Sequence, residues 1–263
     1  MIDSDLWWLT PLILALLIGL ICPATGSLLI TQRRILLANL MAHSVLPGLI
    51  LALAFELDPT LGGLISGLLG ALLAERLNQG FQGREEGAMN TVLAGFTALG
   101  VLLVPLLEAR VDLETLLFGD LLTAGWRDLL QTVVAAGVSL VFISTQYRPL
   151  VFSGVDPDGA ESAGLPVQRL RTVLAVVTTL VVVSAIAAVG IILVISLLCA
   201  PAVLALQRAN SLSGAMVRSS LIGASCSVGG FGLALVLDLP PGPLIGWLCL
   251  LLLLLPKNGH RQN

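Results

Sequence analysis

Asn39 and His43 stand four residues apart in an apolar stretch and are the first candidates for chemistry in this sequence. Because four residues make about one turn of a helix, both side chains would lie on one helix face. An imidazole nitrogen and an amide oxygen placed together offer two ligands to a transition-metal ion. Pro47 removes a helix hydrogen bond one turn later, and carbonyl groups exposed at such breaks also bind ions. The pattern predicts a metal site, and a neutral histidine hydrogen-bonded between helices is the alternative.

The elements that must position these residues are strongly apolar. The chain has 263 residues, of which 57% are hydrophobic and 11% charged, whereas a soluble domain carries about 25% charged residues. The stretches 6–30, 172–206 and 221–237 contain no charged side chain. About 20 apolar residues cross the hydrocarbon layer as a helix. The composition therefore predicts an all-α, polytopic transmembrane helix bundle, and an ionisable residue inside it, such as His43, is a functional candidate by default.

The apolar segments are separated by short charged or Pro/Gly-rich breaks, which predict about eight to nine spans in a single domain, 1–263. The expected spans are 6–29, 36–55, 60–77, 88–107, 127–145, 172–188, 190–207, 216–237 and 243–256. The stretch 172–207 is open to two interpretations, one long broken helix or two short helices that turn at Val189 and Gly190. The first span is interpreted as a retained helix, since only Asp3 and Asp5 precede it and a signal peptide begins with positive charge.

Positive side chains set the orientation, because Lys and Arg are retained on the cytoplasmic side of a membrane. With the N-terminus outside and the C-terminus in the cytoplasm, all 13 Lys and Arg residues except Arg110 and Arg127 lie at or beside cytoplasmic segments. The reverse orientation inverts that ratio. The outer ends of the spans then carry most of the acidic residues, a distribution that follows partly from the same bias.

Small residues recur at intervals of four in one span, where Gly63, Gly67 and Ala71 are joined by Ser66 and Gly70 on the adjacent ridge. Close backbone approach drives helix association in a bilayer. We therefore expect this span to pack against other helices. The four cysteines lie within apolar runs without pairing or metal-ligand spacing and are expected to be buried, unreactive side chains.

Several blocks of the sequence resemble the ABC-3 family of manganese, zinc and iron permeases. The blocks are "LANLMAHSVLPG" (37–48), "REEGAMNTVLAG" (84–95), "LETLLFGDLL" (113–122), "VDPDGAESAGLPV" (155–167), "AVGIILVISLLCAPAVLA" (188–205) and "DLPPGPLIG" (238–246). The resemblance implies the membrane-spanning permease subunit of an ATP-binding-cassette importer, in which the site around His43 meets the transported ion. It covers essentially the whole chain.

The sequence departs from the family's common pattern at one position of that site. Many members have Asp four residues before the histidine, whereas this chain has Asn39, which offers a neutral carbonyl oxygen and no negative charge. Either another acid completes the site, or binding is weaker, or the ion differs from the usual one. Glu86 and Asp120 are the candidate acids, and the alternative for Glu86 is a solvated loop residue.

The sequence contains no ATPase site, because a phosphate-binding loop needs a Gly-rich turn followed by Lys and Ser or Thr. The single lysine, Lys257, lies between Pro256 and Asn258. The work of transport is therefore assigned to a separate ATP-binding subunit on the cytoplasmic side. By resemblance to the family, the cytoplasmic segment 156–166 is the coupling helix that docks on it, through Ala160, Glu161 and Gly164. A plain amphipathic surface loop is the alternative.

The remaining expectations concern partners and cargo. The resemblance implies an extracytoplasmic metal-binding protein on the outer face and a homodimer of this permease in the cell membrane. Membrane lipid is the surrounding solvent, and no nucleic acid and no cofactor other than the transported Mn²⁺ or Zn²⁺ is expected. An oxygen-rich site with one imidazole and no thiolate favours manganese, with zinc next. The rival hypotheses are a gradient-driven secondary metal transporter, which typically shows paired broken helices in matching halves, and a structural or assembly protein of the membrane.

Overall fold

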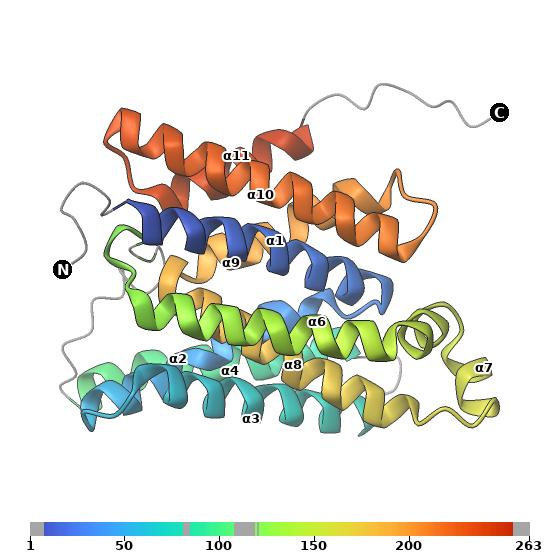
Figure 1. The fold of residues 1–263 in the computed structure, drawn as a ribbon. Coiled ribbons are helices and arrows are strands. Elements are labelled where there is room, and N and C mark those ends of the chain that lie inside the picture. Colours follow the sequence, from blue (N-terminus) through green and yellow to red (C-terminus); the bar gives the residue numbers. More distant parts are fainter. Residues whose placement is uncertain (1–7, 81–84, 108–118, 120, 255–263) are drawn as a thin grey trace.

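The computed structural model describes residues 8–80, 85–107, 119 and 121–254, and within these ranges the chain is helical without strands. The helices are α1 (Leu9–Thr31), α2 (Ile35–Ala54), α3 (Pro59–Gly80), α4 (Glu85–Leu106), the short 3₁₀ helix η1 (Leu121–Thr123), α6 (Trp126–Val155), α7 (Pro157–Ser162), α8 (Val167–Val189), α9 (Ile191–Leu206), α10 (Leu212–Leu237) and α11 (Pro241–Leu254). The long helices lie roughly along one direction, and α7 projects at one end of the bundle (Figure 1). The predicted all-α transmembrane bundle is confirmed.

Seven of these helices are long and apolar enough to cross a membrane, and α9 and α11 are shorter apolar helices, so the predicted eight to nine spans agree with the structure. The stretch 172–207 forms two helices, because the chain breaks at Gly190, whose φ is +79°. A conformation in this region favours glycine. The predicted end of the span 127–145 was too early, since α6 continues to Val155 with Pro149 inside it.

Most of the described positive residues gather at one end of the bundle. They lie where α1, α3, α6 and α9 end and where α2, α8 and α10 begin: Arg33, Arg34, Arg76, Arg148, Arg169, Arg171, Arg208 and Arg218. Arg127, in the first turn of α6, lies at the opposite end. We call this arginine-rich end the cytoplasmic end, following the positive-inside rule, and the other the outer end. The segment α7 lies at the cytoplasmic end (Figure 1).

The small residues of α3 form the contact with its neighbours, as their spacing predicts. Gly48 of α2 and Gly62 of α3 approach so closely that a Cβ atom on either would overlap the other's carbonyl oxygen. The Ser66 hydroxyl donates a hydrogen bond of 2.6 Å to the Ser44 carbonyl oxygen across the same contact. Gly67 faces α8 through Thr179. Helix α2 is therefore held tightly against the outer half of α3, and this contact fixes the position of its functional face.

The remaining helices divide into buried and peripheral ones. In α8, 72% of the apolar window is buried inside the chain, against 17% in each of α4 and α6. The faces that α4 and α6 leave exposed are apolar and suit lipid or a neighbouring membrane chain. Helix α2, at 67% buried, is central but keeps one strip of its surface accessible.

Candidate functional site

Asn39 and His43 lie on that accessible strip of α2. Both side chains are half-buried, whereas the intervening residues Leu40, Met41 and Ala42 are fully buried. At a rise of 1.5 Å per residue, His43 lies roughly 12 Å from the cytoplasmic start of the helix, which places it within the hydrocarbon layer. The two polar side chains share one helix face at membrane depth, as their spacing predicts.

The imidazole of His43 has unused hydrogen-bonding capacity. Its Nδ1 atom is buried and has no hydrogen-bond partner in the described structure. The alternative interpretation, a histidine hydrogen-bonded between helices, therefore has no partner for this nitrogen among the described residues. Buried polar groups normally find a partner, and an exception points to a missing ion, water or ligand. The Nδ1 atom of His43 is thus available to bind a cation.

Pro47 contributes a backbone acceptor to the same place. Helix α2 continues through it from Ile35 to Ala54, but proline has no N–H with which to bond the carbonyl four residues earlier. That carbonyl belongs to His43. The next carbonyl, of Ser44, is already bonded by the Ser66 hydroxyl. One free backbone oxygen thus lies beside the imidazole, as expected from the sequence.

Glu86 lies at a different depth from His43. It is exposed in the first turn of α4 at the cytoplasmic end, and Gly100 of the same helix packs against Leu46 and Pro47 of α2. Since α2 and α4 run in the same direction, counting residues back from this contact separates Glu86 from His43 by roughly 15 Å along the helix axes. The structure does not bring the two side chains together in one chain.

The other predicted acid, Asp120, lies outside the described residues. Within the part of the chain that the structure describes, no three His, Cys, Asp or Glu side chains gather in a way that would hold a metal ion. A single copy of α2 therefore offers His43, the Asn39 amide and one backbone carbonyl. Further ligands must come from water, from another chain or from outside the described ranges.

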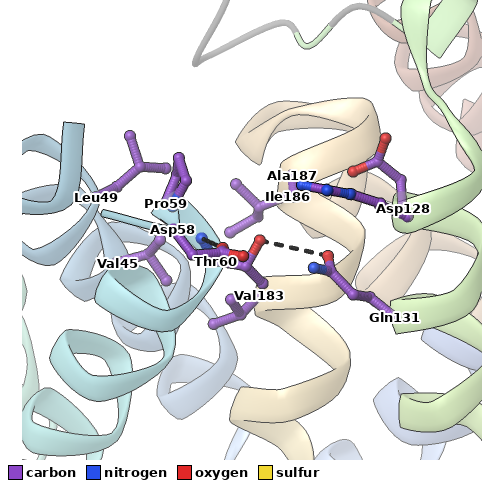
Figure 2. A pocket seen from close by; sticks show the side chains of 11 residues that line it. Val45, Leu49, Asp58, Pro59, Thr60, Asp128, Gln131, Val183, Ile186 and Ala187 are labelled. Carbon is purple, nitrogen blue, oxygen red and sulfur yellow. Dashed lines mark hydrogen bonds between the residues drawn. The ribbon is translucent and has the colours of Figure 1, made fainter. Parts of the chain in front are cut away.

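A cavity of about 290 Å³ opens near the outer end between α2, α3, α6 and α8. Figure 2 shows the apolar side chains of Val45 and Val183 on its wall and the Thr60 hydroxyl bonded to the Gln131 side-chain oxygen across it, at 3.3 Å. Its two carboxylates serve as helix caps: Asp58 accepts from the Thr60 N–H, and Asp128 accepts from the N–H of Gly125, at 2.9 and 2.8 Å. Arg127 also lines the cavity, so the three charged side chains of the lining leave a single net negative charge.

The predicted coupling segment contains α7, a helix of six residues. The Asp156 side chain caps it by accepting from the Gly159 N–H at 2.9 Å, and Gly164, with φ +81°, follows its end. Glu161 and Gly164 are exposed, whereas the Ala160 methyl is fully buried within the chain. Of the three residues predicted to meet the ATPase, Glu161 and Gly164 present surface, and Ala160 anchors the segment.

A buried ion pair at the cytoplasmic end was missed in the sequence analysis. The Arg34 guanidinium donates two hydrogen bonds to Glu75, of 2.5 and 3.2 Å, and the Gln168 amide donates a third at 2.8 Å. The side chains of Arg34 and Glu75 are only 10% and 7% exposed. The available signal was Glu75 itself, an ionisable residue inside the predicted span 60–77.

The fold and the charge distribution define a polytopic helical membrane protein with a polar site on α2 and a projecting cytoplasmic segment. The family model of the ABC 3 transport family matches residues 7–257. The chain therefore belongs to this family of transport permeases.

Named relatives and a solved structure agree with this assignment. The sequence is 32% identical to the manganese import system permease protein ScaB of Streptococcus parasanguinis, over 89% of this chain and 84% of that one. It is 28% identical to the chelated iron transport system membrane protein YfeD of Yersinia pestis, over 89% of this chain and 79% of that one. The structure of PsaBC from Streptococcus pneumoniae in complex with Fab superposes with a TM-score of 0.84 at 29% identity, covering 94% of this chain and 90% of that one.

Proposed function

We propose that this chain is the membrane-spanning subunit of an ATP-driven importer that moves a divalent transition-metal ion, manganese before zinc, across the cell membrane into the cytoplasm. The observation that carries the proposal is the partnerless Nδ1 of His43 at membrane depth, in a chain of the ABC 3 transport family. A histidine held there without a hydrogen bond is costly unless a ligand or ion completes it.

The accessible face of α2 supports a site shared between two copies of the chain. One copy supplies the half-buried side chains of His43 and Asn39 and one backbone carbonyl, which is fewer than the four ligands of a typical zinc site. Two copies of α2 facing each other across a two-fold axis would supply two imidazoles and two amide oxygens. In a symmetric dimer the same patch meets itself, so a single accessible strip suffices for both halves of the site.

The ligand chemistry favours manganese. Amide and carbonyl oxygens with imidazole and without thiolate suit Mn²⁺, whereas thiolates favour zinc and copper(I). ScaB is named for manganese import, which agrees with this choice, and YfeD is named for chelated iron. The replacement of the family's common Asp by Asn39 removes one negative charge from each copy, so we propose weaker binding and faster release than in relatives with Asp.

The coupling partner is a separate ATPase that docks on α7 at the cytoplasmic end. The exposed residues of this segment include three acids, Asp156, Asp158 and Glu161, which suit a basic partner surface. The opposite end would receive a metal-loaded binding protein. Glu86 and Asp120 remain proposed acids along the path, Glu86 at its cytoplasmic exit.

Uptake of radioactive ⁵⁴Mn²⁺ and ⁶⁵Zn²⁺ in cells with and without this gene tests the proposal. We expect the gene to raise ⁵⁴Mn²⁺ uptake more than ⁶⁵Zn²⁺ uptake, with an excess of unlabelled Fe²⁺ as a competitor to test the third metal. Depleting ATP while an ion gradient is maintained should stop the uptake. Uptake that survives ATP depletion and collapses with the gradient would favour the secondary transporter instead.

A further inference from the structure

The turn that precedes α2 is connected by hydrogen bonds to both helices that flank the coupling segment, α6 before α7 and α8 after it. This turn, residues 32–34, links α1 to α2, and Arg33 within it adopts a left-handed conformation with φ +57°. The chain enters α7 from the end of α6 and leaves it into the start of α8. Polar side chains of the turn reach each of these two helices, one by a direct bond and the other through α3.

The first tie joins the turn to α6. The Gln32 side-chain amide donates a hydrogen bond of 2.6 Å to the Leu150 carbonyl oxygen, and its nitrogen also lies 3.3 Å from the Ser153 hydroxyl. Gly154 packs against the same amide and against Thr31, so the backbones are close at this point. Leu150 and Ser153 belong to the last two turns of α6, immediately before Asp156 opens α7.

The second tie joins the turn to α8 through α3. Arg34, the residue before α2, bonds both carboxylate oxygens of Glu75, and Gln168 of the first turn of α8 bonds one of them. Gln168 lies six residues after the last residue of α7. A bidentate arginine–carboxylate pair is directional as well as strong. A carboxylate that accepts from the turn before α2 and from α8 at once fixes their relative position.

Helix α2 can carry a displacement from the turn to the metal site. Asn39 lies five residues beyond Arg34 and His43 nine, roughly 7 and 13 Å along the axis. Pro47, the point at which α2 lacks a backbone hydrogen bond, comes after both. The stretch from the turn to His43 is therefore uninterrupted helix, which moves as a rigid element.

We infer that Gln32, Arg34, Glu75 and Gln168 are positioning residues that transmit movement of the coupling segment to Asn39 and His43. The inference rests on the proposed function, since it assigns the path by which an ATPase bound at α7 would act on the ion. When α7 moves, the end of α6 and the start of α8 move with it, and both pull on the turn that begins α2. Bonds on both sides of the turn make α2 follow α7 instead of sliding past it.

The test compares transport with ATP hydrolysis in the assembled complex. This chain is purified with its ATPase subunit and its metal-binding protein and reconstituted in liposomes, and ⁵⁴Mn²⁺ moved and ATP hydrolysed are measured together. Gln32→Ala removes the hydrogen bond to α6, and Gln168→Ala removes the bond between Glu75 and α8. Neither change leaves a buried charge without a partner, and the double variant removes both bonds. Ser220→Ala is the matched control, because Ser220 is half-buried like the two glutamines and donates a hydrogen bond of 2.7 Å to the Leu20 carbonyl oxygen of α1, away from α6, α7 and α8.

We expect the double variant to assemble and hydrolyse ATP, but to move about tenfold fewer ions per ATP, within the range that coupling mutations produce. Each single variant should lose less, and the control should keep the wild-type ratio. Glu75→Gln should lower the number of ions moved per ATP as much as the double variant does. If Glu75→Gln fails to fold, the Gln32→Ala and Gln168→Ala variants still test the inference. An unchanged ratio in an assembled double variant overturns the inference. A wild-type complex that moves no ions with ATP overturns the proposed function instead.

Discussion

Pro47 lies one helical turn beyond His43 and leaves the His43 carbonyl oxygen without the backbone donor that the helix would otherwise supply. His43 therefore presents both an imidazole whose Nδ1 has no partner and a free backbone carbonyl oxygen, both at membrane depth. Removing the imidazole and removing the proline should consequently have separable effects.

Replacing the imidazole should stop transport without removing the protein from the membrane. We expect His43→Ala to reduce ⁵⁴Mn²⁺ uptake by more than the roughly 10- to 100-fold that the loss of an outer-shell partner costs at metal sites. Abundance in the membrane, measured by immunoblot, should stay normal because the side chain makes no hydrogen bond through Nδ1 that folding would lose. Pro47→Ala restores the helical donor and should have a smaller effect. Wild-type uptake by His43→Ala would make the histidine a packing residue.

Restoring the family's common acid should change affinity and turnover in opposite directions. Asn39→Asp adds a negative charge beside the path, and opposite charge offsets the cost of desolvating the cation. We expect a lower KM for Mn²⁺ and a lower maximal rate, because the more tightly held ion is released more slowly. Uptake measured over a range of Mn²⁺ concentrations separates the two constants. An unchanged KM would show that Asn39 does not face the ion.

Adding a side chain at Gly164 tests the docking surface. A Cβ atom there meets no other atom within 4 Å, but the φ of +81° strains most residues. Asn tolerates this conformation, so Gly164→Asn adds bulk with little strain, whereas Gly164→Val adds strain of about 1–2 kcal/mol. Both should co-purify less ATPase subunit. Normal co-purification with the Asn variant would assign any loss in the Val variant to strain and would count against docking.

The tight contact between α2 and α3 should be intolerant of even one methyl group. We expect Gly48→Ala to lower the free energy of unfolding by about 1–3 kcal/mol, as overpacking does, because its Cβ would overlap the Gly62 carbonyl. Gly95→Ala is the matched control in an open position and should gain about 0.5–1 kcal/mol from helix propensity. Unfolding in a mixed detergent series measures both, and equal stability of the two variants would contradict the close contact.

Cysteine labelling tests the orientation. Ser162, the last residue of α7, is exposed, and Leu239 is exposed at the other end of the bundle. In a background without the native cysteines, Leu239→Cys should react with a membrane-impermeant maleimide added to whole cells. Ser162→Cys should react only after the membrane is opened. Labelling of Ser162→Cys from outside would invert the orientation and remove the ATPase from α7.

Periodicity and composition were enough to predict the local features of this protein. Apolar runs located the helices, and the four-residue spacing of Asn39 and His43 placed both on one face. The ends of helices were less predictable: Arg148 and Pro149 look like the end of a span, yet α6 includes both and continues to Val155. Proline inside a membrane helix is tolerated when neighbouring groups compensate, and the sequence does not show those neighbours.

Contacts between distant segments could not be predicted from the sequence, for a physical reason. The bond network of Arg34, Glu75 and Gln168 joins residues 41 and 93 positions apart, and no local pattern encodes such a meeting. The burial of Ala160 is similar, because only the folded coupling segment shows which of its small residues face inward. The depth of Glu86 likewise follows from the register between α4 and α2, set by Gly100 at their contact.

The break at Gly190 makes the protein sensitive to the thickness of its bilayer. Helix α9 has 16 residues and is therefore about 24 Å long, shorter than a hydrocarbon layer of about 30 Å. The irregular backbone beside it is shielded where Gly119 packs against Val189 and Gly190. Lipids with longer acyl chains make a thicker hydrocarbon layer. They would bury the corner that Gly190 forms between α8 and α9 more deeply and shift the outer ends of these helices relative to the membrane surface. Acyl-chain length in a liposome is thus a physical variable that acts on this corner without changing any residue.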